Sequence, residues 1–90
     1  MVLRFYIDPI SDEPHIYNHG VDEDEVDEIL RHPIEDKRGN NKSRIALGKT
    51  DDGRYLKVIY VLDPWPNSIF VITAYELTGK PLAALRRRQR

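Results

Sequence analysis

The sequence predicts a small α+β domain, in which a short antiparallel sheet of about four strands carries helices from the N-terminal half and a short basic helix at the C-terminal end. Two observations predict this class. Helix-capping signals are concentrated before residue 34, and β-prone runs separated by turn signals fill residues 44–75. One domain accounts for all 90 residues, because they fall within the usual size of a domain and no linker interrupts them.

The start of the chain is expected to form a strand and then a short helix. Val2–Ile7 is apolar and β-prone, and Asp8-Pro9 ends it because the residue before a proline avoids helical geometry. A second element of about two turns is predicted over Ser11–His19. Ser11 would cap it, and Gly20 would stop it in the left-handed conformation.

The next helix has the clearest signals in the chain. Asp22 is placed to cap it, Glu25 follows three residues later as in a capping box, and Pro33 ends it. Its apolar stripe consists of Val26, Ile29 and Leu30. The acidic residues of its first turns suit the positive end of the helix dipole, so a solvated helix face is favoured over a metal or ligand site.

Three β-rich runs follow, Arg44–Gly48, Arg54–Asp63 and Ile69–Tyr75. Asp52-Gly53, between the first two runs, is the strongest hairpin signal in the sequence. Both faces of the middle run are largely apolar, which predicts a central strand covered on each side.

A last helix is predicted through Leu82–Arg88, docked by Leu82 and Leu85. Its end is strongly cationic, because Arg86, Arg87, Arg88 and Arg90 lie almost side by side. A frayed basic end of this kind can become ordered when RNA or an acidic partner binds it.

Composition disfavours several classes of protein. Without cysteines, neither disulfides nor a thiolate metal site can stabilise the fold. The longest apolar stretches are about six residues, far short of the roughly 20 that span a bilayer, and no basic leader precedes an apolar core. We therefore expect a cytoplasmic protein without a membrane partner. No glycine-rich phosphate loop is present, so no cofactor is expected.

The charges are distributed unevenly along the chain. Residues 1–36 contain 11 acidic and 2 basic side chains, a charge of −9, whereas residues 37–90 contain 4 acidic and 12 basic side chains, a charge of +8. Either two solvated faces attract each other at long range, or the basic half is a phosphate-binding surface. The cations Lys37, Arg38, Lys42, Arg44 and Lys49 follow one another without an acidic residue, on a predicted loop and the strand after it. Solvated surface and phosphate contact both remain open for them.

Other candidate residues stand at or near the ends and centres of the predicted strands. Lys57 lies among apolar neighbours, so its ammonium either reaches solvent at a rim or lies in a functional cleft. Tyr75 and Glu76 could supply a hydroxyl and a carboxylate at the mouth of such a cleft, although a tyrosine there is more often a core aromatic. Trp65, between two prolines, either anchors its own loop or marks an interface.

His15 and His19 have the i, i+4 spacing of metal ligands on a helix. No third ligand is near them in the sequence, so no metal site is predicted. A structural role is favoured over acid–base chemistry for this pair, because His19 also occupies an ordinary place before a helix-terminating glycine.

The order of these motifs resembles a known family. His19-Gly20-Val21 precedes an acidic helix that ends at His32-Pro33; the run from Gly48 to Tyr60 follows, and then come Ile72-Thr73-Ala74-Tyr75 and a basic helix. From about Ile16 to Arg88 this order is similar to the BrnT toxins and to uncharacterised RelE-like domains.

The resemblance implies an endoribonuclease toxin of a toxin–antitoxin pair, which cleaves RNA without metal by setting the ribose 2′-hydroxyl against the adjacent phosphate. The implied partners are RNA, free or on the ribosome, and a cognate antitoxin protein. The implied catalytic residues are Lys57, Arg44, Tyr75 and Glu76. The implied nucleic-acid-binding residues are Lys37, Arg38, Lys42, Lys49, Arg86, Arg87 and Arg88.

The chain departs from the BrnT pattern at one place. It has Thr73-Ala74-Tyr75 where those toxins tend to carry Ser-Ala-Arg, which is closer to the uncharacterised branch. A non-catalytic RelE-like module that binds nucleic acid or protein is therefore the alternative, and self-association through the charged halves is a third interpretation. Convergence of Lys57, Arg44, Tyr75 and the final arginines on one cleft would favour the enzyme.

Overall fold

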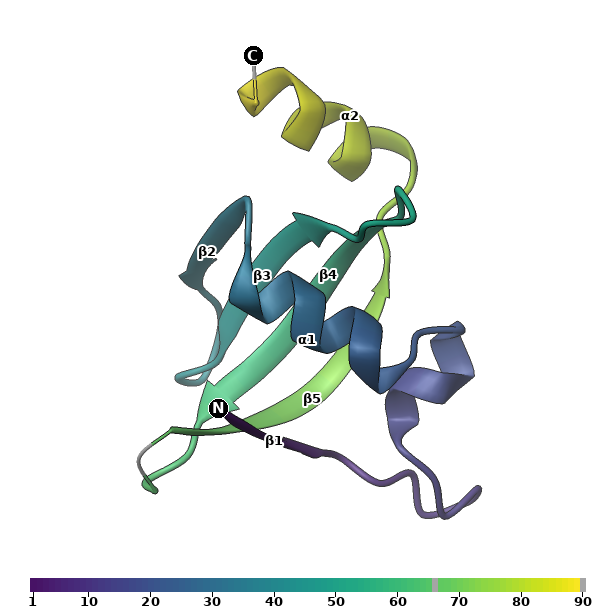
Figure 1. Cartoon of the computed structure of the whole chain (residues 1–90), viewed down its shortest axis with the longest axis vertical. Coiled ribbons are helices and arrows are strands. Elements are labelled where there is room, and N and C mark those ends of the chain that lie inside the picture. The colour runs from purple at the N-terminus through teal and green to yellow at the C-terminus, as the bar shows by residue number, and fades with distance from the viewer. Residues whose placement is uncertain (66, 90) are drawn as a thin grey trace.

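The computed structural model describes residues 1–65 and 67–89, so Pro66 of the predicted turn and Arg90 of the predicted cationic end lie outside the described residues. Figure 1 shows the elements along the chain. They are β1 (Val2–Phe5), the 3-10 helix η1 (His15–His19), α1 (Glu23–Arg31), β2 (Glu35–Arg38), β3 (Arg44–Lys49), β4 (Tyr55–Leu62), β5 (Ser68–Glu76) and α2 (Gly79–Arg88).

The strands form one sheet in the order β1-β5-β4-β3-β2. β1 runs parallel to β5, and all the other neighbours are antiparallel. The predicted α+β class is confirmed. The prediction of an antiparallel sheet of about four strands is wrong, because the sheet has five strands and is mixed.

The strand missing from the prediction is β2. Its four residues, Glu35–Arg38, are all charged, so no apolar alternation marks them as a strand, and Lys37 and Arg38 were expected on a loop. They form a strand because their backbone pairs with β3 at the edge of the sheet, from Glu35 opposite Leu47 to Arg38 opposite Arg44. Charged side chains are well suited to an edge strand, since they oppose pairing with another chain.

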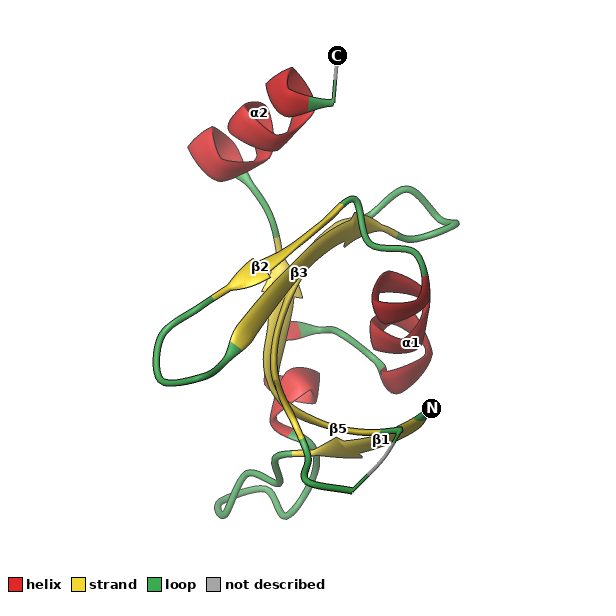
Figure 2. Cartoon of the chain, turned by 90° about the vertical axis from the view of Figure 1, so that its left-hand side faces the viewer, coloured by secondary structure: helices red, strands yellow, loops and turns green. Residues whose placement is uncertain are grey.

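β4 is the central strand, as predicted, and it divides the sheet into two faces. Leu56, Val58 and Tyr60 are buried on the side covered by α1, which we call the α1 face. The alternate residues of β4, among them Lys57 and Ile59, are half-buried on the opposite side, which we call the open face. Figure 2 shows α1 against one side of the curved sheet and α2 beyond one end of it.

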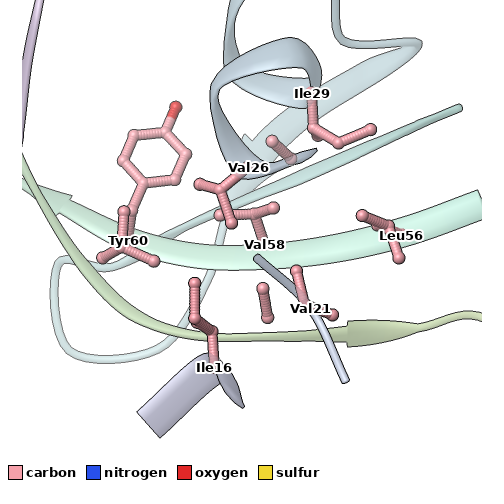
Figure 3. Packing of buried hydrophobic residues seen from close by; sticks show 10 residues of the cluster. Ile16, Val21, Val26, Ile29, Leu56, Val58 and Tyr60 are labelled. Atoms are coloured by element: carbon pink, nitrogen blue, oxygen red, sulfur yellow. The ribbon is translucent and has the colours of Figure 1, made fainter. Parts of the chain in front are cut away.

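α1 begins and ends where the sequence predicts. Asp22 and Glu25 form the capping box, in which the Glu25 amide donates to Asp22 Oδ1 at 2.8 Å, and the helix ends at His32 before Pro33. Ile29 packs so closely on β3 that a Cβ at Gly48 would lie 3.0 Å from Ile29 Cδ1. Figure 3 shows Val26 and Ile29 of α1 over Val58 and Leu56 in the main core.

The remaining helices lie at the margins of the sheet. η1 is shorter than predicted: it starts after Pro14, and Ser11 does not cap it but accepts a hydrogen bond from the Glu13 amide at 3.3 Å. Gly20 ends η1 with φ of 69°, the left-handed stop expected from the sequence.

α2 docks through Leu82 and Leu85, as predicted. Leu85 is fully buried and forms a small cluster with Leu47 and Leu77, while Leu82 packs on it. Leu47 is opposite Lys57 in the β3–β4 pair, so this cluster lies on the open face of the sheet. Within residues 1–65 and 67–89, no helix is both long and apolar enough to cross a membrane.

Candidate nucleic-acid interface

The register of the sheet places cations from several elements on the open face. Lys37 is opposite Ile45 in the β2–β3 pair, and Lys57 is opposite Leu47 in the β3–β4 pair, so the two ammonium groups share one side of the sheet. With Arg88 of α2 they border a pocket of about 260 Å³ between α2 and the sheet. Its apolar walls are Ile45, Leu47, Leu77, Pro81 and Ala84.

Aromatic rings lie between these cations. The Tyr55 ring has Lys49 Nζ at 5.5 Å and Arg86 Cζ at 5.2 Å from its centroid. The Tyr75 ring, in register with Lys57, has the Lys57 Nζ at 5.7 Å. Alternating cations and aromatic faces are typical of surfaces that hold single-stranded nucleic acid, since phosphates pair with the former and bases stack on the latter.

Most cations of the open face lack an acidic partner. Arg88 is the exception next to the pocket, because its Nε and Nη2 donate to Glu35 at 2.5 and 3.0 Å, which lowers the pKa of Glu35. Arg4, at the far edge, pairs with Asp63 at 2.8 Å. No described acidic residue forms an ion pair with Lys37, Lys49, Lys57 or Arg86. The positive charge around Tyr55 and Tyr75 is therefore available to an anion.

Arg44 lies on the α1 face and not with Lys57. Its Nε donates to Asp36 Oδ1 at 3.0 Å, and the Tyr60 hydroxyl donates to the other oxygen of Asp36 at 2.6 Å. Burial, and then the neighbouring Asp36 carboxylate, raise the pKa of Tyr60 to about 12. A hollow of about 550 Å³ lies at the β2–β3 turn. Arg44 borders it together with two other cations, Arg38 and Lys42.

Glu76 is likewise separated from its sequence neighbour Tyr75. It pairs in register with Leu56 of the α1 face, and its Oε1 lies 3.6 Å from Arg54 Nη2. Arg54 also donates to Glu25 at 2.7 Å. The implied catalytic set is thus divided: Lys57 and Tyr75 meet on the open face, whereas Arg44 and Glu76 serve ion pairs elsewhere.

The two charged halves of the chain are joined rather than set apart. Four ion pairs among the described residues connect an acid of one half to a base of the other. They are Arg4–Asp63, Arg44–Asp36, Arg54–Glu25 and Arg88–Glu35. The two halves therefore attract each other through these contacts, and Lys37, Lys49 and Lys57 of the open face are among the described cations that form no ion pair.

A histidine for which the sequence favours a structural role lies beside the site. The His19 ring is 5.9 Å from the Tyr75 ring, and the His15 ring is 5.1 Å from His19. In the sequence, the two histidines were marked only by their i, i+4 spacing. The contact between His19 and Tyr75 was not predictable, because it depends on how η1 packs on β5. Among residues 1–65 and 67–89, no group of three or more His, Cys, Asp or Glu side chains is arranged to hold a metal ion.

Trp65 lies away from this site, on the loop between β4 and β5. It is 72% exposed, so its ring does not anchor the loop, and it borders a hollow of about 420 Å³ together with Leu62 and Met1. The exposed ring fits the interpretation of an interface better than that of a loop anchor.

Comparison with known proteins identifies one family. The family described as "Domain of unknown function (DUF4258)" matches residues 16–76, a segment that runs from η1 to the end of β5. No curated protein and no solved structure matches the chain. His19, Lys57 and Tyr75 lie inside the matched segment, and α2 with its arginines lies after it.

Proposed function

The chain belongs to the DUF4258 family, and we propose that it is an RNA-cleaving protein whose substrate lies on the open face of the sheet. The observation that carries the proposal is the Lys57–Tyr75 pair, with the ammonium 5.7 Å from the ring centroid and further cations on the same face. At this pair, the ammonium can bind a phosphate and the neighbouring aromatic ring can stack on a base.

The proposed reaction needs no metal ion. The ribose 2′-oxygen gives up its proton to a base and bonds to the adjacent phosphorus, the bond from phosphorus to the 5′-oxygen breaks, and that oxygen takes a proton. The products are a 2′,3′-cyclic phosphate and a 5′-hydroxyl. Lys57, held rigidly on the central strand, would stabilise the extra negative charge on the phosphate in the transition state.

In this proposal the protein is the toxin of a toxin–antitoxin pair that acts on RNA, free or on ribosomes, in the cytoplasm. The Lys37–Lys57–Arg88 pocket has apolar walls and a cationic rim. An antitoxin would inhibit by covering the open face, and acidic side chains beside apolar ones would complement that pocket.

A second candidate function is favoured by the position of Arg44 and Glu76. Both belong to ion pairs of the α1 face, so two of the four implied catalytic residues are absent from the open face. A non-catalytic module would use the same cations and rings to bind RNA without cutting it.

Expression in a bacterial host together with a cleavage assay on purified protein tests the proposal. The wild-type chain is expected to arrest growth and to cut RNA, and Lys57→Ala to relieve the arrest, because losing one such donor typically costs on the order of 100-fold in rate. Arg44→Ala is the matched control, since it removes a strand cation from the other face, and it should remain toxic. RNA that is bound but left intact, with or without ribosomes, would instead support the binding module.

A further inference from the structure

Two histidines of η1 lie beside the Lys57–Tyr75 pair, at the edge of the open face. The exposed His19 ring is 5.9 Å from the Tyr75 ring, at an interplanar angle of 45°. Lys57 Nζ is 5.7 Å from the centroid of the same ring. Tyr75 is therefore flanked by an ammonium from β4 and an imidazole from η1.

The His15 ring packs against the His19 ring. The two rings meet edge to face, with centroids 5.1 Å apart at 79°. His15 Nδ1 lies 3.2 Å from Asp8 Oδ2, and Asn18 Nδ2 donates to the same oxygen at 2.7 Å. The Ile10 amide, and then His15 and Asn18, hold the pKa of Asp8 below its usual range. The contact with Asp8 fixes the orientation of the His15 ring.

We propose that His19 accepts the proton of the ribose 2′-hydroxyl, and that His15 with Asp8 is the pair that positions it. The inference rests on the RNA-cleaving function proposed above. Imidazole is the side chain whose ordinary pKa falls between about pH 5 and 8, where a base for this step has to operate. Among the described residues near Tyr75, the two histidines are the groups of this kind.

The step balances with groups of this chain. Neutral His19 takes the 2′-hydroxyl proton as the 2′-oxygen bonds to phosphorus. The bond to the 5′-oxygen breaks, and the Tyr75 hydroxyl gives that oxygen its proton. His19 then returns its proton to water, and the Tyr75 phenolate regains one from water. Lys57 remains protonated throughout and offsets the charge on the phosphate.

Several titratable and charged groups surround His19. Tyr75 faces it from β5 and His15 from η1, while Arg54 donates to the carbonyl of the next residue, Gly20, at 3.1 Å. Beyond these first neighbours lie Lys57, Asp8 and the Arg54 partners Glu25 and Glu76. Among side-chain types, carboxyl groups ordinarily titrate in acid and phenol and ammonium groups in alkali, so a rate change near neutrality points to a histidine.

The test is single-turnover cleavage of an RNA oligonucleotide between about pH 5 and 9, a window that spans the ordinary imidazole pKa. His19→Gln is expected to lower the rate on the order of 100-fold or more and to remove the fall in rate on the acid side, because the base is lost. Affinity for the same oligonucleotide with a 2′-deoxy cleavage site should be unchanged. Added imidazole should partly rescue His19→Ala.

Two further variants separate positioning from folding. His15→Gln should lower the rate less than His19→Gln and shift the acid limb without removing it. His32→Gln is the matched control, since His32 is the exposed C-cap of α1 and should leave rate and pH profile as in wild type. Thermal unfolding of all three variants would show whether the fold is retained.

The outcomes distinguish this inference from the function it rests on. If His19→Gln keeps the rate and acid limb of His32→Gln while Lys57→Ala is inactive, the enzyme stands and the role of His19 is overturned. If the wild-type chain binds RNA but leaves it uncut, both the cleavage and the role of His19 are overturned in favour of the binding module.

Discussion

The two faces of the sheet use their charged residues in opposite ways. On the α1 face, Arg44 is bound to Asp36, which also accepts the Tyr60 hydroxyl, and Arg54 is bound to Glu25 of α1. On the open face, Lys57 and Lys49 lie over tyrosine rings without a described acidic partner. The charges named on the first face hold elements together; on the second face Arg88 and Arg4 do so too, whereas Lys49 and Lys57 face outward.

Residues that are neighbours in the sequence of this sheet therefore belong to different sites. Lys37 points to the open face and Arg38 to the α1 face, because adjacent strand residues alternate. The same alternation separates Tyr75 from Glu76. A cluster of cations in the sequence is therefore two clusters on the molecule.

Truncation in the core under α1 should destabilise the fold more than any other change considered below. Leu56→Ala should lower the free energy of unfolding by about 2 to 5 kcal/mol, because Leu56 is fully buried in the main core and its truncation removes apolar contacts and leaves a cavity. Ile59→Ala, on the half-buried open face of the same strand, should cost clearly less. Urea unfolding of the two variants measures both, and equal losses would contradict the division into two faces.

An alkaline loss of stability should follow from Tyr60. Its pKa is raised to about 12, above the ordinary value of 10.0, so the protonated form is favoured by folding. That contribution is complete below pH 10 and is lost as the pH rises towards 12, by about 2 to 3 kcal/mol in all. Urea unfolding at pH 9 to 11 should therefore show a steeper decline for wild type than for Tyr60→Phe. If the stability of wild type and of Tyr60→Phe declined equally over this pH range, the raised pKa of Tyr60 would be contradicted.

The basic helix should matter for binding and little for stability. Replacing Arg86, Arg87 and Arg88 by alanine removes one exposed ion pair, Arg88–Glu35, which is worth about 0 to 1 kcal/mol. RNA affinity should fall, with a shallower salt dependence, since cations that neutralise phosphates set that slope. A collapse of the far-UV circular dichroism would instead make this segment essential to the fold.

The smallest effect expected is a gain. Thr73 lies on the open face opposite Ile59, and its Oγ1 is buried without a hydrogen-bond partner among the described residues. Thr73→Val keeps the shape and removes the unsatisfied hydroxyl, so stability should rise by about 1 kcal/mol. A loss of stability in thermal unfolding would show that water or another group satisfies the hydroxyl.

Features set by short-range sequence were predictable. The Asp22–Glu25 capping box, the Gly20 stop and the central position of β4 follow from local chemistry and alternation, and the structure has all three. β2 was not predictable in this way, because it is a run of charges that only pairing with β3 makes a strand.

The candidate site depended on contacts between distant segments. Lys57 and Tyr75 were both singled out, but that they meet follows from the β4–β5 register, and a bulge after Ile59 shows that strand sequences alone do not determine it. Arg44 was grouped with them because it too lies in a β-rich run, and only the register shows that it faces α1. The approach of His19 to Tyr75 is a packing contact with no signature in either segment.

RNA binding by two charge-matched double variants shows which face of the sheet holds RNA. Lys37→Gln with Lys57→Gln removes two cations of the open face, and Arg38→Gln with Arg44→Gln removes two cations on the α1 side of the sheet. The first pair should weaken single-stranded RNA binding and reduce the slope of log affinity against log salt by about 0.7 for each phosphate that is no longer neutralised, whereas the second should leave both near wild type. Equal weakening by the two pairs, or stronger weakening by the Arg38 and Arg44 pair, would contradict the assignment of RNA to the open face.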